Sequence, residues 1–132
     1  MQIAFLLAAI AMVESGNDPS ALGKKGEVSQ YQITPKVWRI YSKTPPGKAN
    51  PVMARVVATE HVKSIKALLK KANIPQTPYW IAVVWNGGPS ALVDTSEKVK
   101  DYADRVSAMY CFFESDSRGK SILKNEQVQS HR

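Results

Sequence analysis

The chain has 132 residues, of which 44% are hydrophobic and 22% charged, so we expect one domain with a substantial core. Eighteen Lys and Arg against eleven Asp and Glu give a net charge of +7, which favours anionic partners such as nucleic acid, anionic lipid or acidic cell-wall polymers. The single cysteine, Cys111, excludes an intrachain disulfide, and the two histidines show no metal-ligand spacing with it or with the carboxylates. We therefore expect neither a metal nor another cofactor.

The first predicted element covers residues 3–15 and reads IAFLLAAIAMVES. A helix with no polar face must lie inside a core, so we predict a buried central helix. The apolar run is too short to span a membrane, and it lacks the basic residues that begin a signal peptide. A signal peptide is the alternative interpretation. If the protein is exported, we expect its signal upstream of these residues.

Glu14 is the one carboxylate of this helix and stands where the helix leaves the core. Partial burial and the negative end of the helix dipole both disfavour its anion, so we expect a raised pKa. A carboxyl group that stays protonated near neutral pH can act as a general acid. The alternative is a solvated residue at the helix end.

A loop rich in turn residues follows the first helix. Gly16 suits the left-handed conformation that ends a helix, and residues 17–20 (NDPS) are typical of a turn. Residues 27–33 (EVSQYQI) predict a small β-hairpin in which Val28, Tyr31 and Ile33 point inward.

Three further helices are predicted by a capping residue placed directly before a proline. The pairs are Thr34-Pro35, Asn50-Pro51 and Thr77-Pro78, and the predicted helices cover residues 35–42, 51–72 and 78–86. The second has an apolar stripe opposite a lysine-rich face. The third reads PYWIAVVWN and is apolar nearly all round, so we expect it to be buried.

The last predicted helix covers residues 96–113. Residues 114–132 are polar and predict a mobile tail with at most a frayed turn near Ile122 and Leu123. The predicted fold is mainly α with at most a small β-hairpin, and residues 1–113 form the folded domain.

Four segments, in order, resemble motifs of the soluble lytic transglycosylase (SLT) domain. Residues 11–17 (AMVESGN) resemble its opening Glu-Ser motif, and residues 26–38 (GEVSQYQITPKVW) resemble Gly-Leu-Met-Gln-Ile-x-Pro with Thr-Trp after it. Residues 82–89 (AVVWNGGP) resemble Ala-Tyr-Asn-Ala-Gly-Pro, and residues 101–106 (DYADRV) resemble the closing Tyr-Val segment. One motif alone is a weak signal, whereas four in order at compatible spacing are specific. The family is glycoside hydrolase family 23, with goose-type lysozymes as relatives.

The resemblance implies a lysozyme-like catalytic domain in residues 1–113. It implies that Glu14 is the catalytic acid/base and that Ser15 helps to position it. It also implies that Gln32 lines the substrate cleft, that Asn86 binds the substrate, and that Tyr102 belongs to the substrate site and lies near the catalytic glutamate.

The second and third motifs depart from the family pattern. Ser29, Gln30 and Tyr31 replace Gly-Leu-Met, so the saccharide groove need not have the family's shape. Trp85 replaces the usual tyrosine and offers a surface on which a sugar can stack. A purely structural role stays open for each of these side chains: Gln32 bonded to backbone, Asn86 as a helix cap, and Trp85 or Tyr102 as core.

The activity that the resemblance implies is cleavage of the MurNAc–GlcNAc β-1,4 bond of peptidoglycan. A lytic transglycosylase needs one acid/base, which protonates the leaving oxygen and then takes the proton of the muramyl C6 hydroxyl, closing a 1,6-anhydro ring. A hydrolase needs a second carboxylate, and Glu27 is the nearest candidate unless it is only a loop charge. Goose-type lysozymes carry an Asp where this chain has Thr34. We favour the route with one acid and keep the hydrolase as the alternative.

Two other classes stay open. One is a cell-wall-binding module with little turnover, which the altered second motif permits. The other is a basic helical nucleic-acid binder, but the chain has no recognisable motif for this and we expect no nucleic-acid partner. We expect a monomer without a membrane span that acts on peptidoglycan in the periplasm, at the cell wall or after delivery by a phage.

Overall fold

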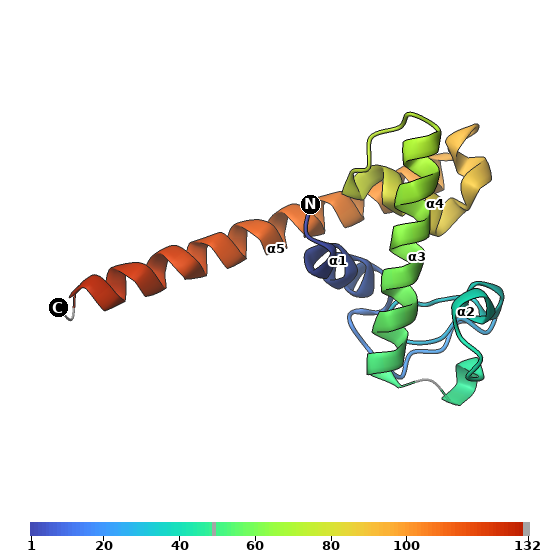
Figure 1. The fold of residues 1–132 in the computed structure, drawn as a ribbon, viewed down its shortest axis with the longest axis horizontal. Coiled ribbons are helices and arrows are strands. Elements are labelled where there is room, and N and C mark those ends of the chain that lie inside the picture. The colour runs from blue at the N-terminus through green and yellow to red at the C-terminus, as the bar shows by residue number, and fades with distance from the viewer. Residues whose placement is uncertain (49, 131–132) are drawn as a thin grey trace.

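The protein is mainly α-helical, as predicted (Figure 1). The structure is a computed structural model that describes the backbone of residues 1–48 and 50–130 and, within this part, the side chains up to residue 117. The helices are α1 (Ile3–Ser15), α2 (Pro35–Tyr41), α3 (Pro51–Lys71), α4 (Pro78–Gly87) and α5 (Glu97–Ser130), with short 3-10 turns at η1 (Pro46–Lys48) and η2 (Pro89–Leu92).

All three predicted helix starts are confirmed. The side chains of Thr34, Asn50 and Thr77 accept hydrogen bonds from the backbone three residues later, and a proline follows each of them. Such a cap stabilises a helix by about 1 kcal/mol because it satisfies an otherwise free N–H. The signal is local, which explains why the sequence places these helices within one or two residues.

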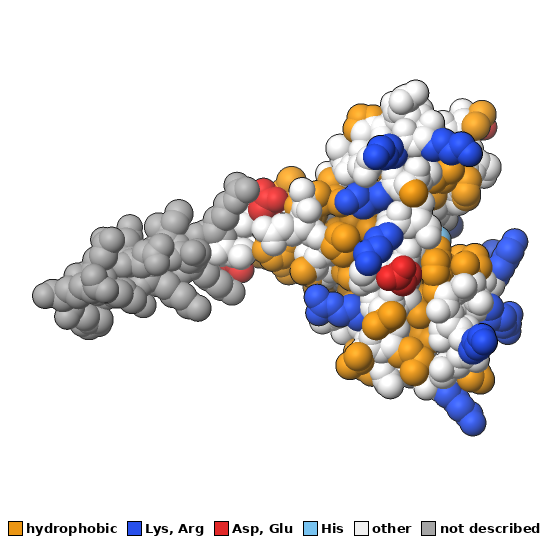
Figure 2. All heavy atoms as spheres, in the orientation of Figure 1, with side chains coloured by type: hydrophobic (Ala, Val, Ile, Leu, Met, Phe, Trp, Pro, Cys, Tyr) orange, Lys and Arg blue, Asp and Glu red, His pale blue; other side chains and the backbone are white. Residues whose placement is uncertain are grey.

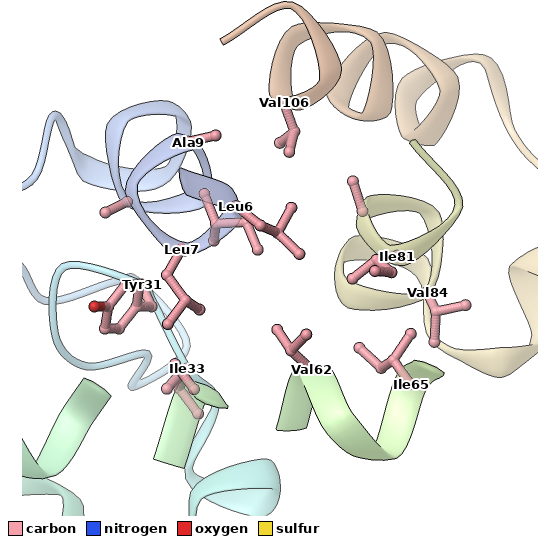
Figure 3. Packing of buried hydrophobic residues seen from close by; sticks show 14 of the residues in the cluster. Leu6, Leu7, Ala9, Tyr31, Ile33, Val62, Ile65, Ile81, Val84 and Val106 are labelled. Carbon is pink, nitrogen blue, oxygen red and sulfur yellow. The ribbon is translucent and has the colours of Figure 1, made fainter. Parts of the chain in front are cut away.

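Helix α1 packs in the centre of the folded body. Leu6, Ala9 and Ile10 are fully buried, and side chains of α1, α3, α4 and α5 meet around them (Figure 3). The burial is not complete all round, because Met12 near the end of α1 is 40% exposed. The buried central helix is therefore confirmed, with one edge open to solvent.

The loop between α1 and α2 forms a compact turn in place of a full hairpin. Val28 and Ile33 exchange two backbone hydrogen bonds of 2.9 Å, and Val28 also bridges to Leu22, but no regular strand forms in the part of the chain that the structure describes. Val28, Tyr31 and Ile33 are buried, as predicted. Ser29 and Gln32 have positive φ angles, so the chain reverses within very few residues.

The predicted end of the last helix near Phe113 is wrong, because α5 continues to Ser130. Residues 114–130 contain no proline, and Glu, Lys, Gln and Arg among them are good helix formers. A polar composition therefore gave a misleading signal of irregular structure. The second half of α5 extends away from the other helices (Figure 1), and residues 131–132 lie outside the described residues.

The surface carries scattered charge. On the face drawn in Figure 2, basic side chains are spread over and around α3, with an acidic one among them. Within the described part of the chain, no helix is both long enough and apolar enough to cross a membrane.

Candidate active site

Glu14 lies in the last turn of α1, half-buried, where Gly16 in the left-handed conformation ends the helix. The hydroxyl group of Tyr102, from α5, donates a hydrogen bond to Glu14 Oε2 at 3.1 Å. Tyr102 is only 4% exposed, so it approaches the carboxylate from the core. The first and last of the four sequence motifs therefore meet at this carboxylate.

The pKa of Glu14 is raised above its ordinary value, mainly because burial disfavours the anion. The hydrogen bond from Tyr102 lowers the pKa, as do the side chain of Trp85 and the positive charge of Arg105, while the negative charge of Glu27 raises it further. Burial outweighs the donors, so the carboxyl group keeps its proton to higher pH than a free one. This is the property expected of a general acid.

A cleft of about 550 Å³ opens beside Glu14, within the size range of ligand sites in proteins. It brings together side chains from α1, α2, α3, α4, the loop before α2 and the start of α5. The lining residues are Glu14, Lys24, Lys25, Glu27, Gln32, Ile33, Thr34, Val37, His61, Trp85, Asn86 and Lys98. Five of the residues singled out in the sequence thus share one cleft: Glu14, Glu27, Gln32, Trp85 and Asn86.

Gln32 holds the loop in shape as well as lining the cleft. Its Nε2 donates to the carbonyl oxygens of Ala21, at 3.0 Å, and Ser29, at 2.9 Å. Both donors are used within the loop, so only the carbonyl end of the side chain is available to a ligand. The backbone-bonding role and the cleft-lining role therefore coexist.

Glu27 stands on the same loop. Its Oε1 accepts a hydrogen bond of 2.9 Å from the backbone N–H of Lys25. Gly23 lies directly beneath it, and a Cβ at that position would collide with the Glu27 carboxylate and lie 2.9 Å from Gln32 Oε1. Only glycine allows these two side chains to pack over the backbone here.

Ser15 lies outside the cleft. Its hydroxyl group donates to the carbonyl oxygen of Gln30 at 2.7 Å and accepts from the backbone N–H of Asp18 at 3.0 Å. It therefore ties the end of α1 to the compact turn and can position Glu14 only through the backbone. Asn86, in contrast, is exposed in the last turn of α4 and lines the cleft.

His61 of α3 is a cleft residue that the sequence analysis missed. Its ring lies between those of Tyr41 and Trp85, with centroid distances of 5.5 and 5.0 Å. A signal was present, because His61 follows the buried Val57 and Ala58 at helical spacing and so falls beside the apolar stripe of α3.

No protein-family model matches the chain, and a comparison with curated proteins gives no match either. The likeness of the four motifs to the SLT domain therefore stays a prediction. In the described part of the chain, no three His, Cys, Asp or Glu side chains are grouped as a metal site would require.

Proposed function

We propose that the protein cleaves the glycan strands of peptidoglycan as a lytic transglycosylase with a lysozyme-like catalytic domain. The observation that carries the proposal is the protonatable carboxyl group of Glu14, half-buried beside a cleft and hydrogen-bonded by Tyr102. The resemblance of four motifs, in the same order, to the SLT domain supports the choice of peptidoglycan as the substrate.

In the first step, protonated Glu14 gives its proton to the glycosidic oxygen as the bond from that oxygen to C1 of MurNAc breaks. The positive charge that develops on the sugar faces the Glu14 carboxylate, which the Tyr102 hydroxyl and Trp85 stabilise. In the second step, this carboxylate accepts the proton of the muramyl C6 hydroxyl as its oxygen bonds to C1. The products are a free GlcNAc hydroxyl and a 1,6-anhydroMurNAc end, with no water consumed.

A lysozyme-type hydrolase is the second candidate, because Glu27 lines the same cleft and its charge acts on Glu14. In that mechanism Glu27 serves as nucleophile or activates a water molecule, and the product has a reducing end. We favour the single-acid route, because it gives Glu27 no role in the reaction. The hydrogen bond from the Lys25 backbone N–H to Glu27 Oε1 is consistent with a structural role for Glu27 in the loop.

Three lysines line the cleft with these carboxylates: Lys24 and Lys25 from the loop and Lys98 from α5. Their charge suits the acidic groups of peptidoglycan better than a neutral glycan. A wall-binding module with little turnover shares this feature, and it differs from the enzyme only in the use of Glu14. We propose action in the periplasm, at the cell wall or after phage delivery, as a monomer.

Purified peptidoglycan incubated with the protein tests the proposal by mass spectrometry of the released fragments. Anhydro-muramyl ends are expected; reducing ends would favour the hydrolase. The variant Glu14→Gln should release no fragments while it still co-sediments with peptidoglycan. Absence of products from the native chain, with binding kept, would leave the wall-binding module.

A further inference from the structure

His61 lines a wall of the cleft and is not among the groups that shift the pKa of Glu14. Its imidazole ring continues an aromatic surface built from three helices, with Tyr41 from α2 on one side and Trp85 from α4 on the other. Burial lowers the pKa of His61, so the ring stays neutral at neutral pH. A neutral imidazole has one nitrogen that donates and one that accepts.

One of these nitrogens is already used. His61 Nδ1 lies 2.9 Å from the hydroxyl oxygen of Tyr41, which fixes the orientation of the ring. The other, Nε2, has no hydrogen-bond partner among the described residues. Among the described residues, Gln30 Oε1 is the one fully buried side-chain oxygen or nitrogen atom that has no hydrogen-bond partner. His61 Nε2 also has no partner but is a different atom, so it is not fully buried and is accessible to solvent. His61 lines the cleft, which is the space that a ligand beside this ring would occupy.

We infer that His61 positions the substrate: its Nε2 hydrogen-bonds a hydroxyl or N-acetyl group of the glycan bound beside Glu14, and Tyr41 holds the ring in place. The inference rests on the proposed function and extends it to a residue outside the four motifs.

A glycan suits this wall for two reasons. The ring of Trp85 can pack against the C–H groups of a sugar, while His61 Nε2 and the amide of Asn86 can hydrogen-bond the hydroxyl and amide groups at its rim. In a neutral imidazole, Nε2 can either donate or accept a hydrogen bond, because the two tautomers differ in which nitrogen carries the proton.

The test uses the full chain with Glu14→Gln, so that nothing is turned over, and tetra-N-acetylchitotetraose as the probe. The nitrogen resonances of the His61 ring are followed by NMR during the titration, and a His131→Gln version assigns them by leaving one imidazole in the chain. We expect the Nε2 resonance to move as the tetramer binds.

Three further variants measure the contribution of the ring. His61→Phe keeps the aromatic wall and should weaken tetramer binding about five- to tenfold, the effect of losing one hydrogen bond. His61→Gln keeps a hydrogen-bonding group and should restore most of the affinity. Tyr41→Phe removes only the hydroxyl group that orients the ring and should cost roughly twofold.

The outcomes separate the inference from the proposed function. If the tetramer binds while the Nε2 resonance stays still, or if His61→Phe binds as well as its parent, the role of His61 is overturned and the proposed function stands. If the tetramer does not bind and the native chain neither binds nor cleaves peptidoglycan, both fail together. The NMR titration observes the unsubstituted His61 ring, so it still tests the inference if a His61 variant does not fold.

Discussion

The hydroxyl group of Tyr102 donates to Glu14 Oε2 at 3.1 Å and so joins two residues that are 88 positions apart in the chain. Burial and the neighbouring negative charge raise the pKa of Tyr102 well above its ordinary value, so the phenol remains a donor at every working pH. A donor that cannot ionise stabilises the carboxylate form of Glu14, which is the form left after proton transfer. The core therefore controls both protonation states of the candidate acid: burial favours the neutral state, and Tyr102 favours the anion.

Tyr102→Phe should slow peptidoglycan cleavage roughly 10- to 100-fold, because a hydrogen bond to a charged group contributes about 1.5–3 kcal/mol. The pH profile should move as well. Removing a donor to the anion raises the pKa of Glu14 further, so the fall in rate on the alkaline side should begin at higher pH. Turbidity clearing of peptidoglycan suspensions, measured across pH, checks both effects.

Tyr110→Phe is the matched control for this experiment. Tyr110 lies on the same helix and its hydroxyl group accepts a hydrogen bond of 2.9 Å from the backbone N–H of Gln2, so the same atom is removed away from the cleft. Its pH profile should coincide with that of the native protein. An equal shift in both variants would show that the effect comes from the packing of α5 and not from Glu14.

Glu14→Gln should abolish cleavage and at the same time stabilise the fold near neutral pH. The folded-state pKa of Glu14 is raised, so the unfolded chain releases this proton more readily and stability is lost as pH rises through the folded-state pKa. Glutamine carries no charge to desolvate and can still accept from Tyr102. We expect a gain of about 0.5–2 kcal/mol at pH 7–8, typical of single stabilising substitutions.

Thermal unfolding of both proteins across pH checks the sign. Below about pH 4.5, the ordinary pKa of this group, Glu14 is protonated in both states and the two melting curves should nearly coincide. The difference should grow with rising pH. A constant difference at all pH values would mean that desolvation of the Glu14 anion is not its cause.

The sequence predicted best what depends on neighbours in the chain. Thr34, Asn50 and Thr77 cap their helices within three residues, so their patterns were sufficient. The length of α5 was missed, because a polar composition does not distinguish an exposed helix from an irregular tail. His61 was missed for another reason: its partners Tyr41 and Trp85 come from two other helices, and no local pattern reports their distance.

Ser15→Ala should destabilise the protein more than it impairs catalysis. The hydroxyl group bonds the backbone of both Gln30 and Asp18, and its loss leaves the carbonyl of Gln30 without this donor. We expect about 1–3 kcal/mol lower stability in urea unfolding, with the cleavage rate well below the melting temperature reduced less than tenfold. Ser20→Ala, whose hydroxyl group bonds only the exposed Asp18 side chain, is the control and should change stability by no more than about 0.5 kcal/mol. A loss of cleavage rate of more than tenfold at a temperature where Ser15→Ala is still folded would give Ser15 a direct part in the chemistry.

Glu27→Gln decides whether Glu14 works alone. Glutamine keeps an oxygen that can accept from Lys25 N–H but carries no charge, so it cannot serve as nucleophile or base. If the single-acid route holds, anhydro-muramyl fragments should persist and the rate should stay within a few-fold of the native value. A hydrolase that uses both carboxylates should instead lose roughly 10²-fold or more.

Gly23→Ala provides an independent test of the same point, because it moves the Glu27 carboxylate without removing its charge. The added methyl group collides with that carboxylate and crowds Gln32 Oε1, so both side chains must shift. For a single acid, the fragments should keep their anhydro ends and the rate should fall only modestly through the displaced Gln32. For a carboxylate pair, the separation of Glu14 and Glu27 sets the reaction, so Gly23→Ala should be nearly as damaging as Glu27→Gln. Mass spectrometry of the fragments, read together with their rate of release, separates the two mechanisms.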